Sequence, residues 1–316
     1  MPSKLLAYNA TLVDRIDYTS ALTTFIVRPD EPLTGDPPFI PGQYVTLGLN
    51  NEERPELGSV RRPMSIASAP AEGNDLAFYI RWVSKPESNN PLTHLLWPLA
   101  VGDRLYLRPK NIGRFTINHT VGNDDTRLRV CVAAGTGLAP FLSMVREVHM
   151  RDPDADLSKW VILHGASYPD DLGYKEELEG LRARGLHYFP TVSRPNEAPD
   201  WRGDSGRVED YFRPERIGEL ESQLGLATGE LDPRRAVILI CGLQGTIGMT
   251  ILRLNDRGFV PETRKLRRAL EVPDDIAPTL FFEQYDNTPV IPVNDEEVMG
   301  PLRASLAAAL ANLSEL

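Results

Sequence analysis

Two short glycine-containing turns follow apolar runs and offer the backbone geometry that a nucleotide needs. The first, Gly135-Thr136-Gly137-Leu138-Ala139-Pro140, comes directly after the run Leu128–Ala134 and opens a helical pattern. Glycines let a backbone approach a diphosphate, and a helix N-terminus adds amide donors and partial positive charge. Pro140 stands where the dinucleotide fingerprint has a third glycine, so this turn alone is equally compatible with a plain tight turn.

The second turn is Cys241-Gly242-Leu243-Gln244-Gly245, at the end of the apolar run Arg235–Cys241. Ligands of open α/β sheets bind at the carboxyl ends of strands, so both turns are predicted to face one crevice. A free cysteine is usually a small buried apolar side chain. A position at the end of a strand nevertheless favours a functional role for Cys241.

Arginines follow the next apolar run. Arg194 ends the sequence Thr191-Val192-Ser193-Arg194, and Arg202 and Gly206-Arg207 come shortly after it. A guanidinium can grip a phosphate with two parallel hydrogen bonds and keeps its charge, so two convergent arginines suit the 2′-phosphate of NADP(H). An NAD site would prefer an acid at this place. Arg202 is more simply explained as a surface residue.

Two polar motifs lie in the first third of the chain. Arg61-Arg62-Pro63-Met64-Ser65-Ile66-Ala67-Ser68 has a strand context, and its Arg and Ser side chains need polar partners if the strand is buried. An edge strand with solvated ends is the simpler alternative. Asn90-Pro91-Leu92-Thr93 precedes a short helix and by itself marks only a helix start.

The elements that position these motifs are of two kinds. Up to about residue 122 the chain has short β-branched and aromatic runs bounded by Gly, Pro, Asn and Asp, which predict a small antiparallel barrel or sandwich. The expected strands here are Leu22–Arg28, Tyr44–Leu49, Leu76–Val83 and Arg104–Arg108.

After the polar turn cluster Gly122–Asp125, strands alternate with helices, which predicts a doubly wound parallel sheet. The expected strands are Leu128–Ala134, Trp160–Gly165, Leu186–Ser193, Arg235–Cys241 and an edge strand at Thr279–Tyr285, and the expected helices are Ala139–Met150, Asp171–Arg184 and Gly245–Arg257. A terminal helix is expected with Pro301 at its first position and with Leu302, Leu306, Leu310 and Leu313 on one stripe.

Composition excludes several classes of protein. The 316 residues suffice for about two domains, and the net charge of −10 argues against a nucleic-acid-binding surface. Cys131 and Cys241 are too few for a disulfide scaffold or for a cysteine-ligated iron–sulfur cluster. No apolar run approaches the ~18 residues of a membrane span, and the start does not read as a signal peptide. We therefore expect a cytoplasmic protein without a membrane span.

Charge is distributed unevenly. The segment Asp274–Leu316 has a net charge of −7, whereas a basic run lies just upstream: Arg253, Arg257, Arg264, Lys265, Arg267 and Arg268. Such clusters are usually solvated faces, and a docking surface for an acidic partner is the sharper hypothesis.

Five motifs together are more specific than any one of them. Arg62-Pro63-Met64-Ser65, Pro91-Leu92-Thr93, the Gly135–Pro140 turn, Ser193-Arg194 and Cys241-Gly242 occur in an order and spacing that resemble the ferredoxin–NADP(H) reductase family, and in particular its bacterial branch, from about residue 8 to Tyr285. The resemblance implies an antiparallel Greek-key β-barrel that binds FAD over residues 1–122. It implies a doubly wound NADP(H)-binding domain over 123–285, followed by a C-terminal extension at 286–316.

The resemblance also assigns residues to the two nucleotides. It implies that Arg62 and Thr93 bind the FAD diphosphate, that Ser65 hydrogen-bonds the flavin near N5, and that Tyr285 shields the ring. The remaining FAD-binding residues that it implies are Pro63, Met64, Arg81, Trp82, Leu92 and Thr136.

For NADP(H), the resemblance implies that Arg194 and Arg207 bind the 2′-phosphate and that Cys241 packs beside nicotinamide C4. The other NADP(H)-binding residues that it implies are Gly135, Thr136, Gly137, Ser193, Gly242 and Gln244. Ser65, Cys241 and Tyr285 are the expected catalytic residues.

The chain departs from the family pattern at three places. Met64 replaces the usual tyrosine that stacks on the flavin, and a thioether gives weaker stacking. Ser167 stands where bacterial members often carry an arginine for the 2′-phosphate, which weakens the expected preference for NADPH. Residues 286–316 extend past the usual end, and they would cover the adenine end of FAD, form a dimer contact or hinder the nicotinamide.

The resemblance implies a FAD enzyme that exchanges hydride with NADP(H) and single electrons with an acidic ferredoxin or flavodoxin. A second hypothesis is a reductase that feeds an oxygenase, or that reduces free flavin or metal, and uses NADH as readily as NADPH. A third is a non-catalytic flavin-binding subunit whose extension occludes the nicotinamide site. The oligomeric state does not follow from the sequence.

Overall fold

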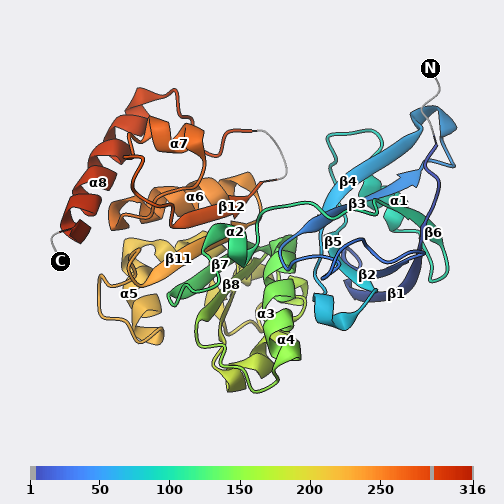
Figure 1. Cartoon of the computed structure of the whole chain (residues 1–316), viewed down its shortest axis with the longest axis horizontal. Coiled ribbons are helices and arrows are strands. Elements are labelled where there is room, and N and C mark those ends of the chain that lie inside the picture. The colour runs from blue at the N-terminus through green and yellow to red at the C-terminus, as the bar shows by residue number, and fades with distance from the viewer. Residues whose placement is uncertain (1–4, 285–287, 315–316) are drawn as a thin grey trace. The chain divides into compact units, whose positions relative to one another are not determined.

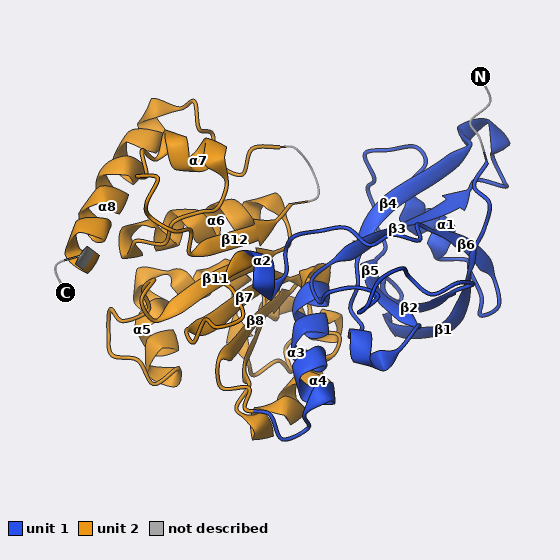
Figure 2. Ribbon diagram, in the orientation of Figure 1, with its two compact units in different colours: residues 1–119, 138–155 blue, residues 120–137, 156–316 orange. Residues whose placement is uncertain are grey.

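The computed structural model describes residues 5–284 and 288–314. The chain divides into two compact units, which are coloured separately in Figure 2. The first unit comprises residues 1–119 and 138–155, and the second comprises residues 120–137 and 156–316.

The first unit is built on a six-stranded antiparallel sheet (Figure 1). Its strands are β1 (Ala10–Thr19), β2 (Leu22–Pro29), β3 (Tyr44–Asn50), β4 (Ser59–Ser65), β5 (Leu76–Arg81) and β6 (Arg104–Leu107). The order β4-β3-β6-β1-β2-β5 is a Greek-key arrangement, because β6 returns to lie beside β1. This confirms the predicted antiparallel class.

The sheet curls into a barrel-like form around an apolar core that includes Phe25, Phe39 and Phe78. The ladder is open between β4 and β5, but two hydrogen bonds join the chain near these edges. Ala67 N donates to Ala77 O at 2.8 Å, and Ala77 N donates to Ser68 Oγ at 3.0 Å. The end of the motif that starts at Arg61 is therefore held at a sheet edge by one backbone bond and one bond to the Ser68 side chain.

Three helices accompany this sheet: α1 (Leu92–Leu96), α2 (Ile117–Thr120) and α3 (Ala139–Arg151). Helix α3 belongs to the first unit by its packing. Its Ser143 Oγ donates to Ser68 O at 2.6 Å, and its Glu147 carboxylate accepts from Ala71 N at 2.9 Å. Gly42 has φ +95°, and a Cβ there would lie 2.0 Å from the Phe115 carbonyl oxygen. Only glycine fits this close approach.

The second unit contains a six-stranded sheet in which every neighbouring pair is parallel. Its strands are β7 (Leu128–Ala134), β8 (Trp160–Ala166), β9 (His187–Val192), β10 (Asp204–Ser205), β11 (Ala236–Cys241) and β12 (Leu280–Glu283). The order is β10-β9-β8-β7-β11-β12, so the chain changes direction across the sheet between β7 and β11. The predicted parallel α/β class is confirmed.

The described residues of this unit form five α-helices: α4 (Lys175–Gly180), α5 (Pro214–Gln223), α6 (Gln244–Leu254), α7 (Arg264–Ala269) and α8 (Glu296–Ser314). Strands β7, β8 and β11 supply the centre of the core, and Ile247 and Ile251 of α6 pack into it. The sequence did not predict α5, α7 or the two-residue strand β10. None of the helices in the described part of the chain has the length and hydropathy needed to cross a membrane.

The C-terminal helix starts earlier than expected. Asp295 caps it, because Glu297 N donates to Asp295 Oδ1 at 3.0 Å and Met299 N donates to Asp295 O at 2.8 Å. Pro301 consequently lies inside α8 and not at its first position, so that prediction was wrong. The capping bonds of Asp295 start the helix at Glu296, and they outweigh the usual preference of proline for the first helical position.

The predicted leucine stripe of α8 does face the core of the second unit. Leu306 and Met299 are fully buried, and Leu302 and Leu310 pack against the same core. The helix is also tied by Asn255 Nδ2, which donates to Leu302 O at 2.8 Å. The extension is therefore an integral part of the second unit.

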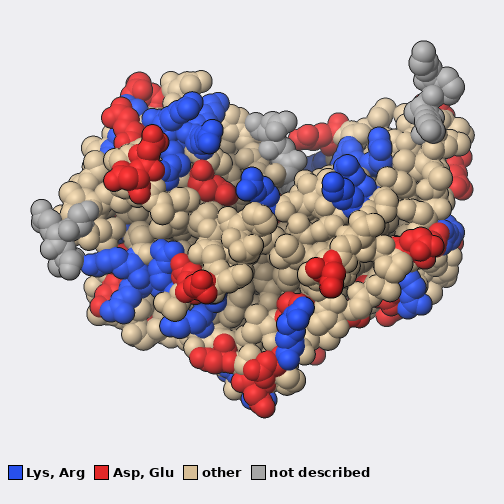
Figure 3. All heavy atoms as spheres, viewed as in Figure 1, with Lys and Arg blue, Asp and Glu red and all other residues tan. Residues whose placement is uncertain are grey.

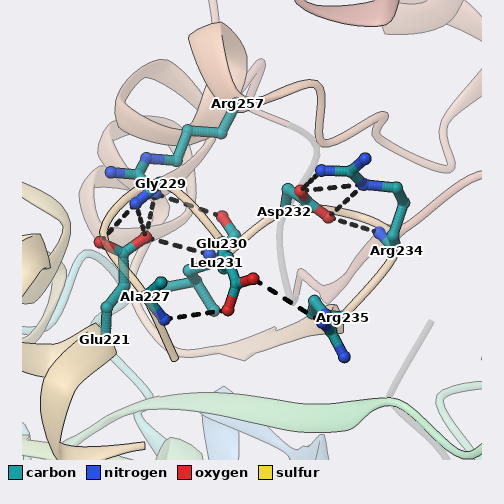
Figure 4. Close-up of polar contacts among 9 residues, drawn as sticks. All are labelled: Glu221, Ala227, Gly229, Glu230, Leu231, Asp232, Arg234, Arg235 and Arg257. Atoms are coloured by element: carbon teal, nitrogen blue, oxygen red, sulfur yellow. Dashed lines mark hydrogen bonds and ion pairs between the residues drawn. The ribbon is translucent and has the colours of Figure 1, made fainter. Parts of the chain in front are cut away.

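A buried carboxylate organises the loop that leads into β11 (Figure 4). Glu221 accepts hydrogen bonds from Gly229 N at 3.0 Å and from Leu231 N at 3.0 Å, and it forms an ion pair with Arg257. Burial alone raises the pKa of Glu221, but these donors outweigh burial and hold the pKa below its usual value. The side chain therefore stays ionised at neutral pH and fixes the start of β11.

Candidate nucleotide-binding sites

The two glycine turns meet at the point where the strand order of the second unit reverses. Ala133 of β7 is paired with Cys241 of β11, so the turns that follow lie side by side. A Cβ on Gly137 would lie 2.0 Å from Cys241 O, and a Cβ on Gly242 would lie 2.7 Å from Ala134 Cβ. Only glycines permit these contacts, and such a switch point is where open α/β sheets bind ligands.

The turn itself leaves its backbone accessible. Gly135 has φ +56°, and apart from the glycine and its two chain neighbours none of the described residues has an atom within 4 Å of a Cβ built there. Thr136 is half-buried, and the turn runs directly into α3. Open space beside a positive-φ glycine is what a diphosphate needs in order to reach backbone N–H groups.

Cys241 is fully buried at the carboxyl end of β11 and forms no disulfide. Gln244, three residues later, donates from Nε2 to Pro289 O at 2.6 Å. A Cβ on Gly248 would lie 2.4 Å from Val290 O, so residues 289–290 run close along α6. Gln244 therefore holds the C-terminal extension here, an engagement that the sequence did not predict.

A buried histidine lies next to the first turn. His164 of β8 is fully buried, its Nδ1 is 3.1 Å from the Tyr188 hydroxyl, and its ring lies close to the Gly135 backbone. Its Nε2 has no hydrogen-bond partner among the described residues. Burial lowers the pKa of His164 to about 4, and the Gly135 contact opposes this only in part. His164 is thus neutral at pH 7. The sequence predicts no role for His164, although a histidine inside an apolar strand stands out in the sequence as a candidate buried polar residue.

The predicted 2′-phosphate residues share one edge of the sheet. Ser193 N donates to Ala166 O at 2.9 Å, and Arg194 N donates to Ser167 O at 3.1 Å. Gly206 N donates to Val192 O at 2.9 Å, which places Arg207 at the end of the adjacent strand β10. The structure therefore brings Ser193, Arg194 and Arg207 together.

Arg202 does not belong to that set. It is exposed, and its Nη1 donates to the carbonyls of Pro199 and Trp201 within its own loop.

In the first unit, β4 presents the residues expected at FAD. Alternate residues of a strand share a face, so Arg62 and Met64 lie on one face, and Pro63 and Ser65 on the other. Arg62 is exposed, and its Nη1 donates to Arg61 O at 2.8 Å. Within residues 5–284 and 288–314 it has no acidic partner. Met64 packs against the barrel core, and Ser65 is buried.

Helix α1 packs against β3 and β4 and places Thr93 near this strand. Thr93 and its neighbour Leu92 are buried. Among the described residues Thr93 Oγ1 has no hydrogen-bond partner. A buried hydroxyl without a partner costs stability. This orphaned hydroxyl, together with the exposed guanidinium of Arg62, which has no acidic partner among the described residues, fits the diphosphate of FAD.

Arg81 ends β5 and Trp82 follows it directly, so the strand stops two residues before its expected end at Val83. The Trp82 ring stacks on His94 of α1, with centroids 4.9 Å apart and planes 13° apart, and Trp82 N donates to Ala21 O at 2.9 Å. The sequence did not single out His94. Its ring nitrogen lies 2.8 Å from Val83 O, which fixes the stack beside Thr93. Tyr285 lies outside the described residues.

Three of the six residues of the predicted basic run form ion pairs or hydrogen bonds within the second unit. Arg253 pairs with Asp210 at 2.8 Å, Arg257 pairs with Glu221, and Arg267 Nη2 donates to Ile276 O at 2.7 Å. The other three, on α7, are exposed and form a basic patch visible in Figure 3: Arg264, Lys265 and Arg268. We call these three residues the α7 patch.

Comparison with known proteins places these sites in context. Residues 131–250 match the model of the oxidoreductase NAD-binding domain. The chain is 34% identical over 239 residues to ferredoxin–NADP reductase B of Sorangium cellulosum, covering 72% of this chain and 82% of that protein. It is 25% identical over 224 residues to the phenol 2-monooxygenase reductase component DmpP of Pseudomonas sp., covering 70% and 58%.

The fold also matches solved structures. A ferredoxin NADP+ reductase from Neisseria gonorrhoeae, solved with bound FAD and NADP, superposes with a TM-score of 0.67 at 21% identity. The alignment covers 87% of this chain and 97% of that one.

Proposed function

Because the chain belongs to the ferredoxin–NADP reductase family, we propose that it is a FAD-dependent oxidoreductase that takes electrons from NADPH and passes them singly to a ferredoxin or flavodoxin. FAD supplies the redox chemistry when bound, since a flavin accepts two electrons together and releases them one at a time. The residues of this chain bind and orient the reacting molecules.

The direct contact of the two glycine turns is the observation that most supports this function. Gly137 and Gly242 pack so closely that no side chain fits at either place. The open backbone at Gly135 is proposed to bind the nicotinamide dinucleotide through its diphosphate, and Cys241 is proposed to border the nicotinamide. Neutral His164 beneath the turn avoids placing a buried positive charge there.

The FAD site is proposed on β4 and α1. Arg62 and the Thr93 hydroxyl are the candidates for the diphosphate, since Arg62 has no acidic partner and Thr93 Oγ1 has no hydrogen-bond partner among the described residues. Ser65 is the candidate donor to the flavin ring, and Met64 would contact the ring where the family has an aromatic residue. Trp82, stacked on His94, is proposed to line the same cofactor.

Rapid mixing with NADPH tests this proposal. The purified full-length protein is expected to be yellow and to lose its flavin absorbance when it is mixed with NADPH in a stopped-flow cell without oxygen. A colourless protein that does not take up added FAD would contradict the cofactor assignment. A yellow protein that neither NADPH nor NADH bleaches would contradict the proposed reaction.

The electron-carrier partner is proposed to bind at the α7 patch. Acidic carriers are steered by a basic surface, and such steering weakens as salt concentration rises. Arg264, Lys265 and Arg268 are exposed, whereas the other basic residues of the run have partners inside the unit.

A reductase that serves an oxygenase is the second candidate function. The similarity to the reductase component DmpP supports it, and so does Ser167 at a position expected to discriminate between nicotinamides. Rates with a ferredoxin, with a flavodoxin and with an oxygenase component as acceptors separate the two candidates. A cytoplasmic location stays a prediction, which cell fractionation tests.

A further inference from the structure

Near the edge of the second sheet, the Tyr168 hydroxyl forms hydrogen bonds with both a cationic and an anionic side chain. Arg194 Nη1 donates to the Tyr168 hydroxyl at 2.8 Å, and this hydroxyl donates to Glu197 Oε2 at 2.8 Å. The guanidinium also lies over the Tyr168 ring, 5.5 Å from its centroid. One aromatic side chain therefore fixes the relative positions of Arg194 and Glu197.

The backbone fixes the same arrangement independently. Arg194 N donates to Ser167 O at 3.1 Å, which places Arg194 beside Tyr168. Glu197 N donates to Arg194 O at 3.2 Å within the turn Pro195–Glu197, so the chain curls the carboxylate back toward the arginine. The acid is thus placed by the fold at the edge that carries Arg194.

Charge at this edge is close to balanced. Arg207, the other candidate for the 2′-phosphate, lies 3.9 Å from the carboxylate of Glu209, which is almost fully buried. A phosphate group carries roughly two negative charges at neutral pH and competes with both carboxylates for the arginines. A ribose 2′-hydroxyl is a donor that instead needs an acceptor, and a carboxylate is the group that NAD sites provide.

We propose that Glu197 is a specificity-determining residue that lowers the preference for NADPH over NADH by engaging Arg194 through the Tyr168 hydroxyl. This inference rests on the proposed function, because it concerns the nicotinamide that the same edge binds. Ser167 acts in the same direction, since it supplies no additional guanidinium at the adjacent position.

Coenzyme kinetics of a single variant test the inference. Glu197→Gln keeps the shape of the side chain and removes its charge. With the full-length flavin-containing protein and ferricyanide as electron acceptor, the ratio of kcat/KM for NADPH to that for NADH is expected to rise about fivefold, in keeping with one exposed ionic contact. The change is expected mainly in the KM for NADPH.

Glu176→Gln is the matched control. Glu176 is an exposed carboxylate on α4 in the same unit, and it takes no part in the Tyr168 contact. Its removal changes the net charge equally and is expected to leave the ratio unchanged. An equal rise in both variants would overturn the proposal, because it would trace the effect to net charge alone.

Two further measurements test whether the effect of Glu197→Gln arises at the 2′-phosphate and passes through Tyr168. Calorimetry with adenosine 2′,5′-bisphosphate is expected to show tighter binding to Glu197→Gln, and AMP is expected to show no gain. In a Tyr168→Phe background the effect of Glu197→Gln is expected to shrink, because the hydroxyl that couples the two charges is gone. An undiminished effect there would contradict the role of Tyr168.

Failure of the proposed function and failure of the proposed role of Glu197 give different experimental results. If neither nicotinamide bleaches the flavin of the unaltered protein, the proposed function fails. If both nicotinamides bleach it and the NADPH-to-NADH ratio of Glu197→Gln equals that of the unaltered protein, only the role of Glu197 fails.

Discussion

At the scale of single residues, the two glycine turns can pack together only because Gly137 and Gly242 have no side chain. Gly137 and Gly242 are required because backbone or Cβ atoms of the opposite turn occupy the space where their own Cβ atoms would lie. The same reasoning separates these glycines from Gly245 of α6, which has no described atom within 4 Å of a Cβ built on it. Glycine is thus needed at some positions of the motif and not at others.

Gly137→Ala is expected to impair the nicotinamide site selectively. A methyl group at 2.0 Å from Cys241 O must displace one turn from the other. We expect kcat/KM for NADPH to fall by about 100-fold, the size of loss that a 1 Å misplacement of a reacting group causes, while the flavin spectrum is retained. Gly245→Ala is the control and should leave the rate unchanged. Equal rates for the two variants would show that the close approach of the turns does not position the nicotinamide.

Glu221→Gln is expected to destabilise the protein at neutral pH. Glu221 is fully buried and ion-paired with Arg257, and removal of one partner of a buried pair costs about 3 kcal/mol. The folded pKa of Glu221 lies below its usual value, so the stability that it contributes is present above an unfolded pKa of about 4.3 and declines as pH falls through the folded pKa.

Urea unfolding at pH 7 and near pH 4 measures this effect. The difference in unfolding free energy between the unaltered protein and Glu221→Gln should shrink at the lower pH. Glu219→Gln, on the exposed side of the same helix, should change stability by less than about 0.5 kcal/mol at either pH. A difference that does not vary with pH would contradict the ionised state of Glu221.

At the scale of elements, the C-terminal extension behaves as part of the second unit. Leu306 of α8 is fully buried in the core that also contains Ile247 and Ile251 of α6. Leu306→Ala is expected to lower the unfolding free energy by about 2–4 kcal/mol, through lost transfer energy and a residual cavity. The exposed Ala307→Ser should cost only a few tenths of a kcal/mol. Thermal melts of both variants decide whether α8 is structural or dispensable.

The elements most readily predicted are those whose signal is local. The parallel strands are uninterrupted apolar runs, so β7, β8, β9 and β11 were located within one or two residues of their observed bounds. Strand β1 was missed because its register shifts near Leu12 and Asp17 break the alternation, and because Ile16 is exposed. Helix α7 was read as a charge run, since only Leu266 of its residues is buried.

In the candidate sites too, local features could be predicted from the sequence and contacts between distant residues could not. The glycine turns were predicted because each lies within one segment of the sequence. The stack of Trp82 on His94 and the contact of Tyr168 with Arg194 and Glu197 were not, because they join residues that only strand pairing or helix packing brings together. The split of the basic run depended likewise on distant acids at Asp210 and Glu221.

At the scale of the whole molecule, a basic patch stands on a chain with a net charge of −10. The α7 patch is therefore a positively charged surface on a negatively charged protein. An acidic carrier would be attracted to this patch and repelled by the negative charge of the rest of the molecule. Arg264→Glu, Lys265→Glu and Arg268→Glu combined are expected to weaken the apparent affinity for a ferredoxin or flavodoxin about tenfold at low salt and to flatten its salt dependence.

Lys159→Glu, directly before β8, is the control for this triple variant, and reduction of ferricyanide by NADPH is expected to stay unchanged in both. Carrier reduction is followed over a range of salt concentrations. If the triple variant keeps the affinity and the salt slope of the unaltered protein, the carrier binds at another surface.

The in-register parallel ladder of the second unit has a consequence for ligand length. Arg194 lies two residues after the end of β9, and β9 is the second strand from β7, whose last residue, Ala134, is followed by the glycine turn. Neighbouring strands are about 4.8 Å apart, so the two anchor points are separated by roughly 10 Å. That spacing is set by backbone hydrogen bonds and does not change with side-chain substitution. Under the proposed assignment of the 2′-phosphate to Arg194 and of the diphosphate to the glycine turn, a nicotinamide mononucleotide would reach only the turn, because it lacks the adenosine 2′-phosphate.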